Sequence, residues 1–134
     1  MNNKNTNKIK FSIITVTKNS EKYLERNILS LKKQIYNNYE HIIIDSNSKD
    51  KTKKILRKYK SGLKILSEED EGLYYAMNKG IKLASGQVIG ILNSDDFYYP
   101  KALKIINDYF TNNPKIDFVF GSTIKYNKIM TGFY

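Results

Sequence analysis

The chain has 134 residues, 40% of them hydrophobic, which suits a single domain with a substantial core. Cysteine is absent, so a disulfide scaffold, thiol chemistry and a cysteine-based zinc site are excluded. The formal net charge of +10 comes almost entirely from lysine, with arginine only at Arg26 and Arg57, whereas nucleic-acid readers favour the bidentate arginine side chain. We therefore expect no nucleic-acid partner, but affinity for phosphorylated ligands or for an anionic membrane surface.

The start of the chain is polar. Residues 1–8 are rich in Asn and Lys and lack the apolar stretch of a signal peptide, so we expect a disordered lead-in there. No apolar run approaches the about 20 residues that span a bilayer. These features predict a cytoplasmic protein, with peripheral association at the inner face of the membrane if its basic surface binds lipid.

Strand-like and helix-like patterns then alternate along the chain. Apolar, β-branched runs predict strands, and Leu and Ile at helical spacing predict the helices between them. The predicted strands cover residues 11–16, 41–45, 63–66, 88–92 and 117–121, with 123–129 as a candidate sixth strand. The predicted helices cover residues 21–33, 50–59, 73–84 and 100–112. Gly86 is expected to end the third helix, and the single histidine, His41, to be a strand residue. The alternation predicts an α/β fold, a Rossmann-like three-layer sandwich with a mostly parallel central sheet.

Polar and acidic residues follow the predicted strands. The loops at the carboxyl ends of parallel strands converge on one edge of the sheet, where such folds bind their ligands. No glycine motif of a dinucleotide site or a P-loop follows the first strand. Asp95 and Asp96, directly after the strand 88–92, are adjacent acids that a hard divalent cation would hold together. The alternative is that Asp96 caps the helix entered at Pro100.

Four segments, in order and spacing, resemble the nucleotide-binding half of glycosyltransferase family 2, which has the GT-A fold. These segments are Phe11–Asn19, Tyr39–Ser48, Glu69–Gly80 and Leu92–Asp96. The resemblance implies inverting transfer of a hexose from a nucleotide sugar, most often a UDP-sugar, with the help of Mg²⁺ or Mn²⁺. It further implies a saccharide or lipid-linked acceptor, in the synthesis of surface polysaccharides.

The resemblance also assigns donor-binding roles to residues of these segments. The residues are Thr15, Val16, Lys18, Asn19, Asp45, Asp70, Asn78, Asn93, Ser94 and Asp95. Asp45 would hydrogen-bond the uracil, and its alternative is to cap a turn. Asp70 has the alternative of a surface acid, and Asn78 that of a helix-packing amide. Asn93-Ser94-Asp95 occupies the place of the family's D-x-D motif, so Asp95, with Asp96 beside it, is the expected metal ligand.

Three departures from the family pattern matter. Lys18 stands where an aromatic residue is frequent, and Tyr75 where close relatives have an acid. The family's general base lies in an acceptor-binding half beyond the metal motif, and no carboxylate follows Asp117. We therefore expect residues 9–134 to form an apparently truncated donor-binding domain, without the acceptor part or a general base. An exposed apolar surface would then favour self-association.

Two alternatives to an active transferase remain open. One is a nucleotide-sugar-binding fragment that needs another chain for catalysis. The other, less favoured by the scarcity of arginine, is a nucleic-acid-binding α/β domain.

Overall fold

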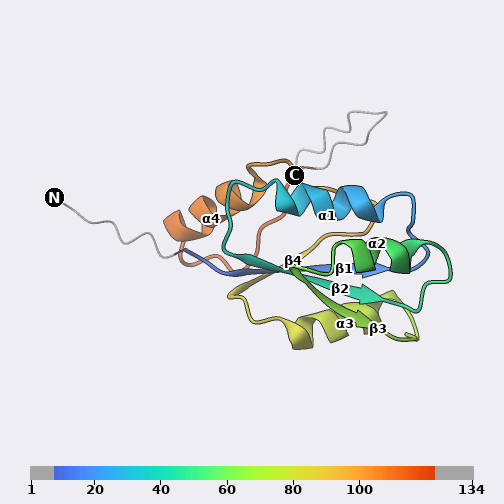
Figure 1. Cartoon of the computed structure of the whole chain (residues 1–134). Coiled ribbons are helices and arrows are strands. Elements are labelled where there is room, and N and C mark those ends of the chain that lie inside the picture. Colours follow the sequence, from blue (N-terminus) through green and yellow to red (C-terminus); the bar gives the residue numbers. More distant parts are fainter. Residues whose placement is uncertain (1–7, 123–134) are drawn as a thin grey trace.

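The computed structural model describes residues 8–122 as a four-stranded sheet between two layers of helices (Figure 1). The strands are β1 (Phe11–Thr17), β2 (Tyr39–Asp45), β3 (Leu63–Ser67) and β4 (Val88–Ile91). The helices are α1 (Leu24–Lys32), α2 (Thr52–Lys58), α3 (Leu73–Leu83) and α4 (Ala102–Asn112). The strand order is β3-β2-β1-β4 and all neighbours are parallel, which confirms the predicted α/β class.

Both faces of the sheet are buried by helices. On one face of the sheet, β1 is covered by α1 and α4, and β2 is covered by α1 and α2. On the other face, α3 packs across β1 and β2 (Figure 1). Successive residues of β1 point to opposite faces, so Ile13 joins the cluster under α4 while Ile14 packs under α3. This two-sided burial explains why the central strands are nearly continuous apolar runs.

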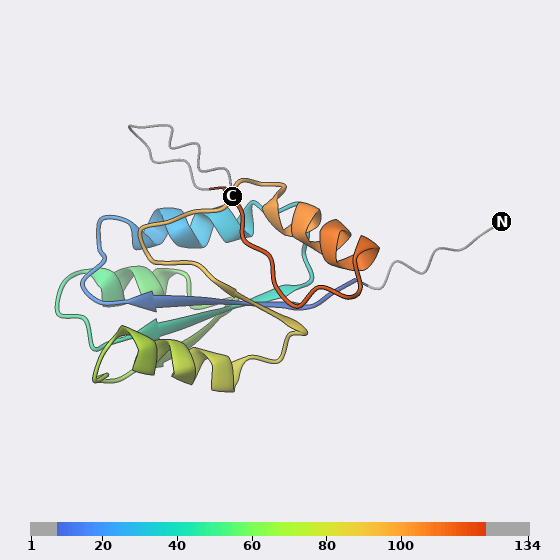
Figure 2. The ribbon, with the colours of Figure 1, turned by 180° about the vertical axis from the view of Figure 1, so that it is seen from behind.

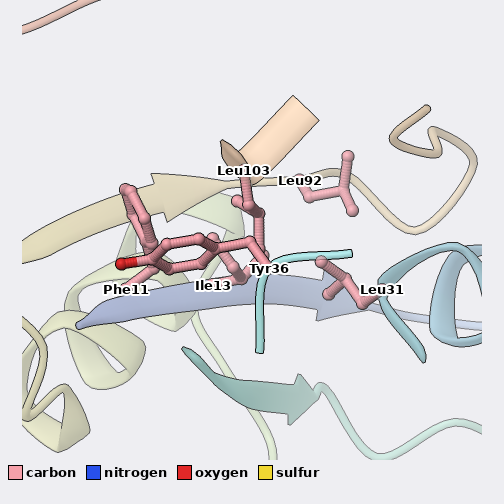
Figure 3. Packing of buried hydrophobic residues seen from close by; sticks show 6 residues of the cluster. All are labelled: Phe11, Ile13, Leu31, Tyr36, Leu92 and Leu103. Atoms are coloured by element: carbon pink, nitrogen blue, oxygen red, sulfur yellow. The ribbon is translucent and has the colours of Figure 1, made fainter. Parts of the chain in front are cut away.

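The cluster between β1 and α4 ties the start of the fold to its end. Figure 3 shows its six buried residues, which are Phe11, Ile13, Leu31, Tyr36, Leu92 and Leu103. The rings of Phe11 and Tyr36 meet edge to face with their centroids 5.6 Å apart. The single hydroxyl proton of Tyr36 has two acceptors within reach, the carbonyl oxygen of Ile9 (2.7 Å) and the side-chain oxygen of Asn107 (2.8 Å). The phenol is therefore satisfied inside an otherwise apolar cluster.

The predicted strand over 117–121 is wrong, because this segment follows α4 as irregular chain (Figure 2). Its side chains of Phe118 and Phe120 stack on each other at 6.3 Å and are 74% and 81% exposed. No strand within residues 8–122 pairs with the segment, and an apolar run forms a strand only where a neighbouring strand accepts its backbone hydrogen bonds. The candidate sixth strand, 123–129, lies outside the described residues, as do residues 1–7 of the expected lead-in.

Gly86 has a different role from the predicted one. The third helix ends at Leu83, and the extended residue Ala84 follows it, so no glycine closes the helix. A Cβ atom on Gly86 would lie 2.7 Å from both the Lys10 carbonyl oxygen and the Ser12 amide nitrogen. Glycine is thus required by the close approach of the chain to the start of β1.

Glu40 joins three segments at the amino end of the sheet. Its Oε1 atom accepts hydrogen bonds from the Ser12 hydroxyl (2.5 Å) and from the Ser85 amide (2.7 Å) and hydroxyl (2.9 Å). Lys64 lies 4.0 Å from the other carboxylate oxygen. Burial alone would raise the pKa of Glu40, but these hydrogen bonds and the lysine charge lower it to about 2.

Glu40 is expected to make the fold sensitive to acid. Because its pKa falls from 4.5 to about 2 on folding, its stabilisation is complete above pH 4.5 and is lost as the pH falls towards 2. Glu40→Gln should lower the free energy of unfolding at pH 7 by about 2 kcal/mol and flatten the loss of stability between pH 5 and pH 2. Denaturant unfolding at several pH values measures both effects. Glu71→Gln, at an exposed glutamate, is the matched control, and equal acid profiles for the two variants would contradict the assignment.

Candidate functional site

A cavity of about 350 Å³ opens at the carboxyl edge of the sheet. All four predicted loops contribute to it. Its lining residues are Val16, Lys18, Ser20, Ser46, Asp70, Gly72, Leu73, Asn93, Ser94 and Asp95. Six of the residues expected to bind the donor therefore line one cavity, and they come from the ends of β1, β3 and β4. The ends of parallel strands are where ligands bind in open α/β sheets.

The loops after β1 and β2 are tied to each other at the rim of this cavity. Asn19 and Asn47 both adopt a left-handed backbone conformation with φ of 53°, which asparagine tolerates well. The side-chain oxygen of Asn19 accepts a hydrogen bond from the backbone amide of Lys49 (2.8 Å). The backbone amide of Asn19 donates a hydrogen bond to Ser48 Oγ (2.8 Å). Asn19 thus fixes the two loops together, although its side chain does not line the cavity.

Thr15 and Asp45, both expected at the donor, lie behind the cavity wall. Thr15 is fully buried against His41, with 3.0 Å between Thr15 Oγ1 and His41 Nε2. Asp45 is fully buried as well, and its carboxylate accepts the hydroxyl protons of Ser48 (2.5 Å) and Ser67 (2.6 Å) and the Ser48 amide (3.2 Å). These bonds match the turn-capping alternative for Asp45. A carboxylate can accept about four hydrogen bonds, so these three contacts leave one acceptor position of Asp45 unused, although the residue is fully buried and does not line the cavity.

Asp70 forms an ion pair with a lysine of helix α3. Its side chain is 1% exposed and accepts the Ser46 hydroxyl proton (2.8 Å), so it is not a surface acid. Lys79 Nζ lies 2.5 Å from Asp70 and 2.5 Å from Glu68. The Asp70 contact is an ion pair by distance, although its angle is outside that of a regular hydrogen bond. The carboxylates of Asp70 and then of Glu68 raise the pKa of Lys79, so the lysine stays charged and the two ion pairs connect the β3–α3 loop to α3.

Asn78 lies next to Lys79 on α3 but not at the cavity. Its side chain is exposed, and it forms no side-chain hydrogen bond within residues 8–122, which removes the helix-packing alternative. Lys79 was not expected as a site residue. The acidic run before α3, from Glu68 to Glu71, was the signal that could have identified it.

The residues from Asn93 to Asp96 form a tight turn, closed by a hydrogen bond from the Asp96 amide to the Asn93 carbonyl (3.0 Å). The Asp95 carboxylate is exposed at the cavity and has no hydrogen bond or ion pair within the described part of the chain. Asp96 does not line the cavity, and α4 begins only at Ala102, with Lys101 at its cap position. The alternative that Asp96 caps this helix is therefore wrong.

The chemistry of the turn suits a hard divalent cation that arrives with a phosphorylated ligand. Within residues 8–122, no three histidine or acidic side chains form a group that could hold a metal alone. Mg²⁺, however, is usually bound by one or two carboxylates, with phosphate and water oxygens completing its shell. The unpartnered Asp95 carboxylate fits that mode. Among the lining residues, Asp70 is already paired with Lys79, so no free carboxylate besides Asp95 is available to act as a base.

Three comparisons with known proteins bear on this site. The family model described as Glycosyl transferase family 2 matches residues 12–132. WfgD of Escherichia coli, a UDP-Glc:alpha-D-GlcNAc-diphosphoundecaprenol beta-1,3-glucosyltransferase, is 36% identical over 114 residues. That match covers 83% of the chain and 44% of WfgD. TarS of Staphylococcus aureus, a poly(ribitol-phosphate) beta-N-acetylglucosaminyltransferase, is 33% identical, with 72% of the chain and 18% of TarS covered.

Solved structures share the fold. A crystal structure of S. aureus TarS residues 1–349 with UDP-GlcNAc superposes with a TM-score of 0.72 at 30% identity, covering 79% of the chain and 32% of that structure. A mannosyltransferase from Pyrobaculum calidifontis in complex with GDP-Man and Mn²⁺ superposes with a TM-score of 0.68 at 21% identity. The latter covers 75% of the chain and 32% of that structure, and it supports the fold alone. The chain thus spans less than half of the length of each of these relatives.

Proposed function

Since the chain belongs to glycosyltransferase family 2, we propose that its cavity binds a nucleotide sugar for glycosyl transfer. The observation that carries this proposal is the Asp95 carboxylate, which has no partner within residues 8–122 and is exposed in a cavity at the ends of parallel strands. A UDP-sugar is the donor we favour, because the WfgD name specifies UDP-Glc and a TarS structure holds UDP-GlcNAc. The acceptor we favour is a saccharide or a lipid-linked saccharide of surface polysaccharide synthesis, in the manner that the WfgD name describes for that protein.

In this proposal, the chain's residues hold and orient the donor. Asp95, with Asp96 beside it, would bind Mg²⁺ or Mn²⁺, and the ion would stabilise the charge that develops on the diphosphate leaving group. Lys18 lines the same cavity and can attract the phosphates, while Asn93 can hydrogen-bond a ribose hydroxyl. Asp45 would use its remaining acceptor position for the uracil. An acceptor hydroxyl would attack from the face opposite the diphosphate, which gives inversion, and the base that takes its proton is not assigned.

Calorimetric titration of UDP with and without Mn²⁺ tests the donor site. We expect Mn²⁺ to raise the affinity for UDP about 100-fold, a free-energy gain of about 2.7 kcal/mol. Binding that does not depend on metal, or no binding of UDP, would contradict the proposal. Incubation of the 134-residue chain with UDP-sugars and a lipid-linked acceptor then separates transfer from the alternative of binding without transfer.

A cytoplasmic location at the inner face of the membrane is a further part of the proposal. Seven basic residues and one acidic residue fall between positions 49 and 60, which accounts for more than half of the net charge. Six of these basic residues are exposed on or near α2, namely Lys49, Lys51, Lys54, Arg57, Lys58 and Lys60. Such a cluster attracts anionic lipid head groups, where lipid-linked acceptors would be found. Among residues 8–122, no helix has the length and apolar character needed to cross a bilayer.

Vesicle sedimentation tests the membrane proposal. The chain should bind vesicles that contain phosphatidylglycerol but not vesicles of phosphatidylcholine alone. Binding to the phosphatidylglycerol vesicles should weaken about 100-fold when Lys51, Lys54 and Arg57 are changed to glutamate. The control carries the same charge reversal at three exposed lysines outside this cluster, Lys82 on α3, Lys101 before α4 and Lys115 after it. An equal loss in both variants would indicate a net-charge effect rather than a binding face, and stronger binding to DNA than to vesicles would favour the nucleic-acid alternative.

Self-association is proposed through exposed apolar side chains of β4 and of the segment that follows α4. Ile89 and Ile91 are each 41% exposed, and Phe118 and Phe120 are more exposed still. Contiguous apolar patches commonly mark interaction surfaces, and we propose that these side chains contribute to one. Light scattering coupled to gel filtration should show a concentration-dependent dimer that Phe118→Ser with Phe120→Ser converts to monomer, and a monomeric wild-type chain would refute this proposal.

A further inference from the structure

Helix α1 holds the turn that carries Asp95 through the turn's carbonyl oxygens. The Asn27 Nδ2 group donates to the Asn93 carbonyl (2.8 Å) and to the Asp96 carbonyl (3.2 Å). The Arg26 guanidinium donates to the Asp95 carbonyl at 2.7 Å. Three of the four carbonyl groups of the turn therefore bond to two consecutive residues of α1, and the turn cannot shift without breaking these bonds.

Asn27 is a polar residue in a position that the core would fill with an apolar one. It is fully buried, and so are Leu24, Ile28 and Leu31, which share its face of α1. Asparagine is a weak helix former, and burying an amide costs stability unless its hydrogen bonds are made. Because core packing alone favours leucine at this position, the asparagine is explained by what its amide group contacts.

The orientation of the Asn27 amide follows from its neighbours. Both groups that it meets on the turn are carbonyls, which need a donor, so the nitrogen faces the turn. Its oxygen faces the Thr15 hydroxyl, 3.4 Å away, and Thr15 in turn contacts His41 in the core. Burial lowers the pKa of His41 to about 3, so this interior network carries no charge at neutral pH. The amide is thus held from both sides in one orientation.

We infer that Asn27 is a positioning residue for Asp95. By binding both ends of the turn, Asn27 presets the backbone so that the Asp95 carboxylate faces the cavity without an internal partner. Arg26 supports the same geometry from the surface, since its guanidinium also lies 4.7 Å from the ring centroid of Phe97, directly after the turn. The inference rests on the proposed function, in which Asp95 binds a metal ion together with the nucleotide diphosphate.

The test compares the same substitution at two buried asparagines. Asn27→Leu removes both donors to the turn, and we expect it to reduce the Mn²⁺-dependent gain in UDP affinity about tenfold, as for groups that orient metal ligands. UDP binding without Mn²⁺ should stay within about twofold of wild type. Asn107→Leu, on α4 at the amino end of β1, should lower Tm to a similar degree and keep the full gain, because within residues 8–122 the Asn107 side chain bonds only Ile9, Tyr36 and Asp108.

Hydrogen exchange gives a second measurement that needs no ligand. In Asn27→Leu, the amide of Asp96 should exchange at least about tenfold faster than in wild type, whereas Asn107→Leu should leave its exchange unchanged. Unchanged exchange together with a full Mn²⁺ gain in Asn27→Leu would overturn the inference. A wild-type chain without any Mn²⁺ gain would instead refute the proposed function, and the exchange measurement would still decide the role of Asn27.

Arg26→Ala keeps the inference testable if Asn27→Leu does not fold. Arg26 is exposed, so its replacement should not affect folding. Loss of its bond to the Asp95 carbonyl should reduce the Mn²⁺ gain about threefold and speed exchange at the turn, a smaller effect than that of Asn27. No change in either measurement would contradict a role for α1 in positioning the turn.

Discussion

Replacing Asp95 with alanine is expected to abolish the gain in UDP affinity that Mn²⁺ provides. The Asp95 carboxylate has no hydrogen bond or ion pair within residues 8–122, so it contributes little to the fold and is free to bind a cation. The free energy of unfolding should therefore stay within about 0.5 kcal/mol of wild type, as for other exposed positions. UDP binding measured without metal should also be unchanged. Calorimetry and denaturant unfolding of the same preparation give all three quantities.

Two control variants make the Asp95 result specific. Asp108→Ala removes an exposed acid on α4 that pairs with Lys104, and it should keep the full Mn²⁺ effect. Asp96→Ala should have a smaller effect than Asp95→Ala, because Asp96 does not line the cavity. If Asp95→Ala retains the Mn²⁺ gain, the metal lies elsewhere. If Asp95→Ala destabilises the fold by several kcal/mol, the carboxylate has a structural role in addition to metal binding.

Replacing Asp45 with alanine is expected to be the most destabilising single change near the cavity. It would leave the Ser48 amide and the hydroxyls of Ser48 and Ser67 without their buried acceptor. Loss of these three bonds should lower the free energy of unfolding by about 3 kcal/mol. Denaturant unfolding measures this loss. Ser67→Ala, which removes one of the bonds, should cost about 1 kcal/mol and serves as the matched control.

Asp45→Asn separates the structural role of this residue from its proposed contact with uracil. The amide keeps one acceptor oxygen, so the loss of stability should be smaller than in Asp45→Ala. If the Asp45 carboxylate contacts the uracil base, Asp45→Asn should also reduce the preference for UDP over CDP in metal-free binding. A preference equal to that of wild type would limit Asp45 to holding the β2–α2 and β3–α3 loops together, and wild-type stability of Asp45→Ala would contradict both roles.

Much of the fold could be predicted from the sequence because local pattern and burial agree. The apolar runs at 11–16 and 41–45 became the two central strands, whose side chains are buried on both faces. The run at 117–121 is also apolar at its centre, but no strand within residues 8–122 lies beside it, and pairing is a property of the whole sheet rather than of the segment. Gly86 was misassigned for a related reason, since the backbone that excludes a Cβ atom lies more than 70 residues earlier in the chain.

Site residues that belong to the family motifs could be predicted from the sequence. Site residues whose role depends on tertiary contacts could not. Asp70 and Asp95 were expected, and both line the cavity. The positioning role of Asn27 could not be predicted from its spacing, because its place on the apolar face of the helix indicates only a core residue. Lys79 likewise acquires its role only when α3 brings it to within 2.5 Å of Asp70. Contacts between residues far apart in sequence thus account for what was missed.

The central place of β1 has a consequence for how this chain folds. β1 is the first strand to be synthesised, yet it pairs on one side with β2 and on the other with β4, and it also packs under Leu103 of α4. The sheet therefore cannot be complete until residues 88–91 have been made, and the cluster around Phe11 must wait for residue 103. Parallel pairings over such separations slow folding. A nascent chain that ends before β4 exposes one edge of its central strand, so this edge stays open to aggregation until β4 has been made.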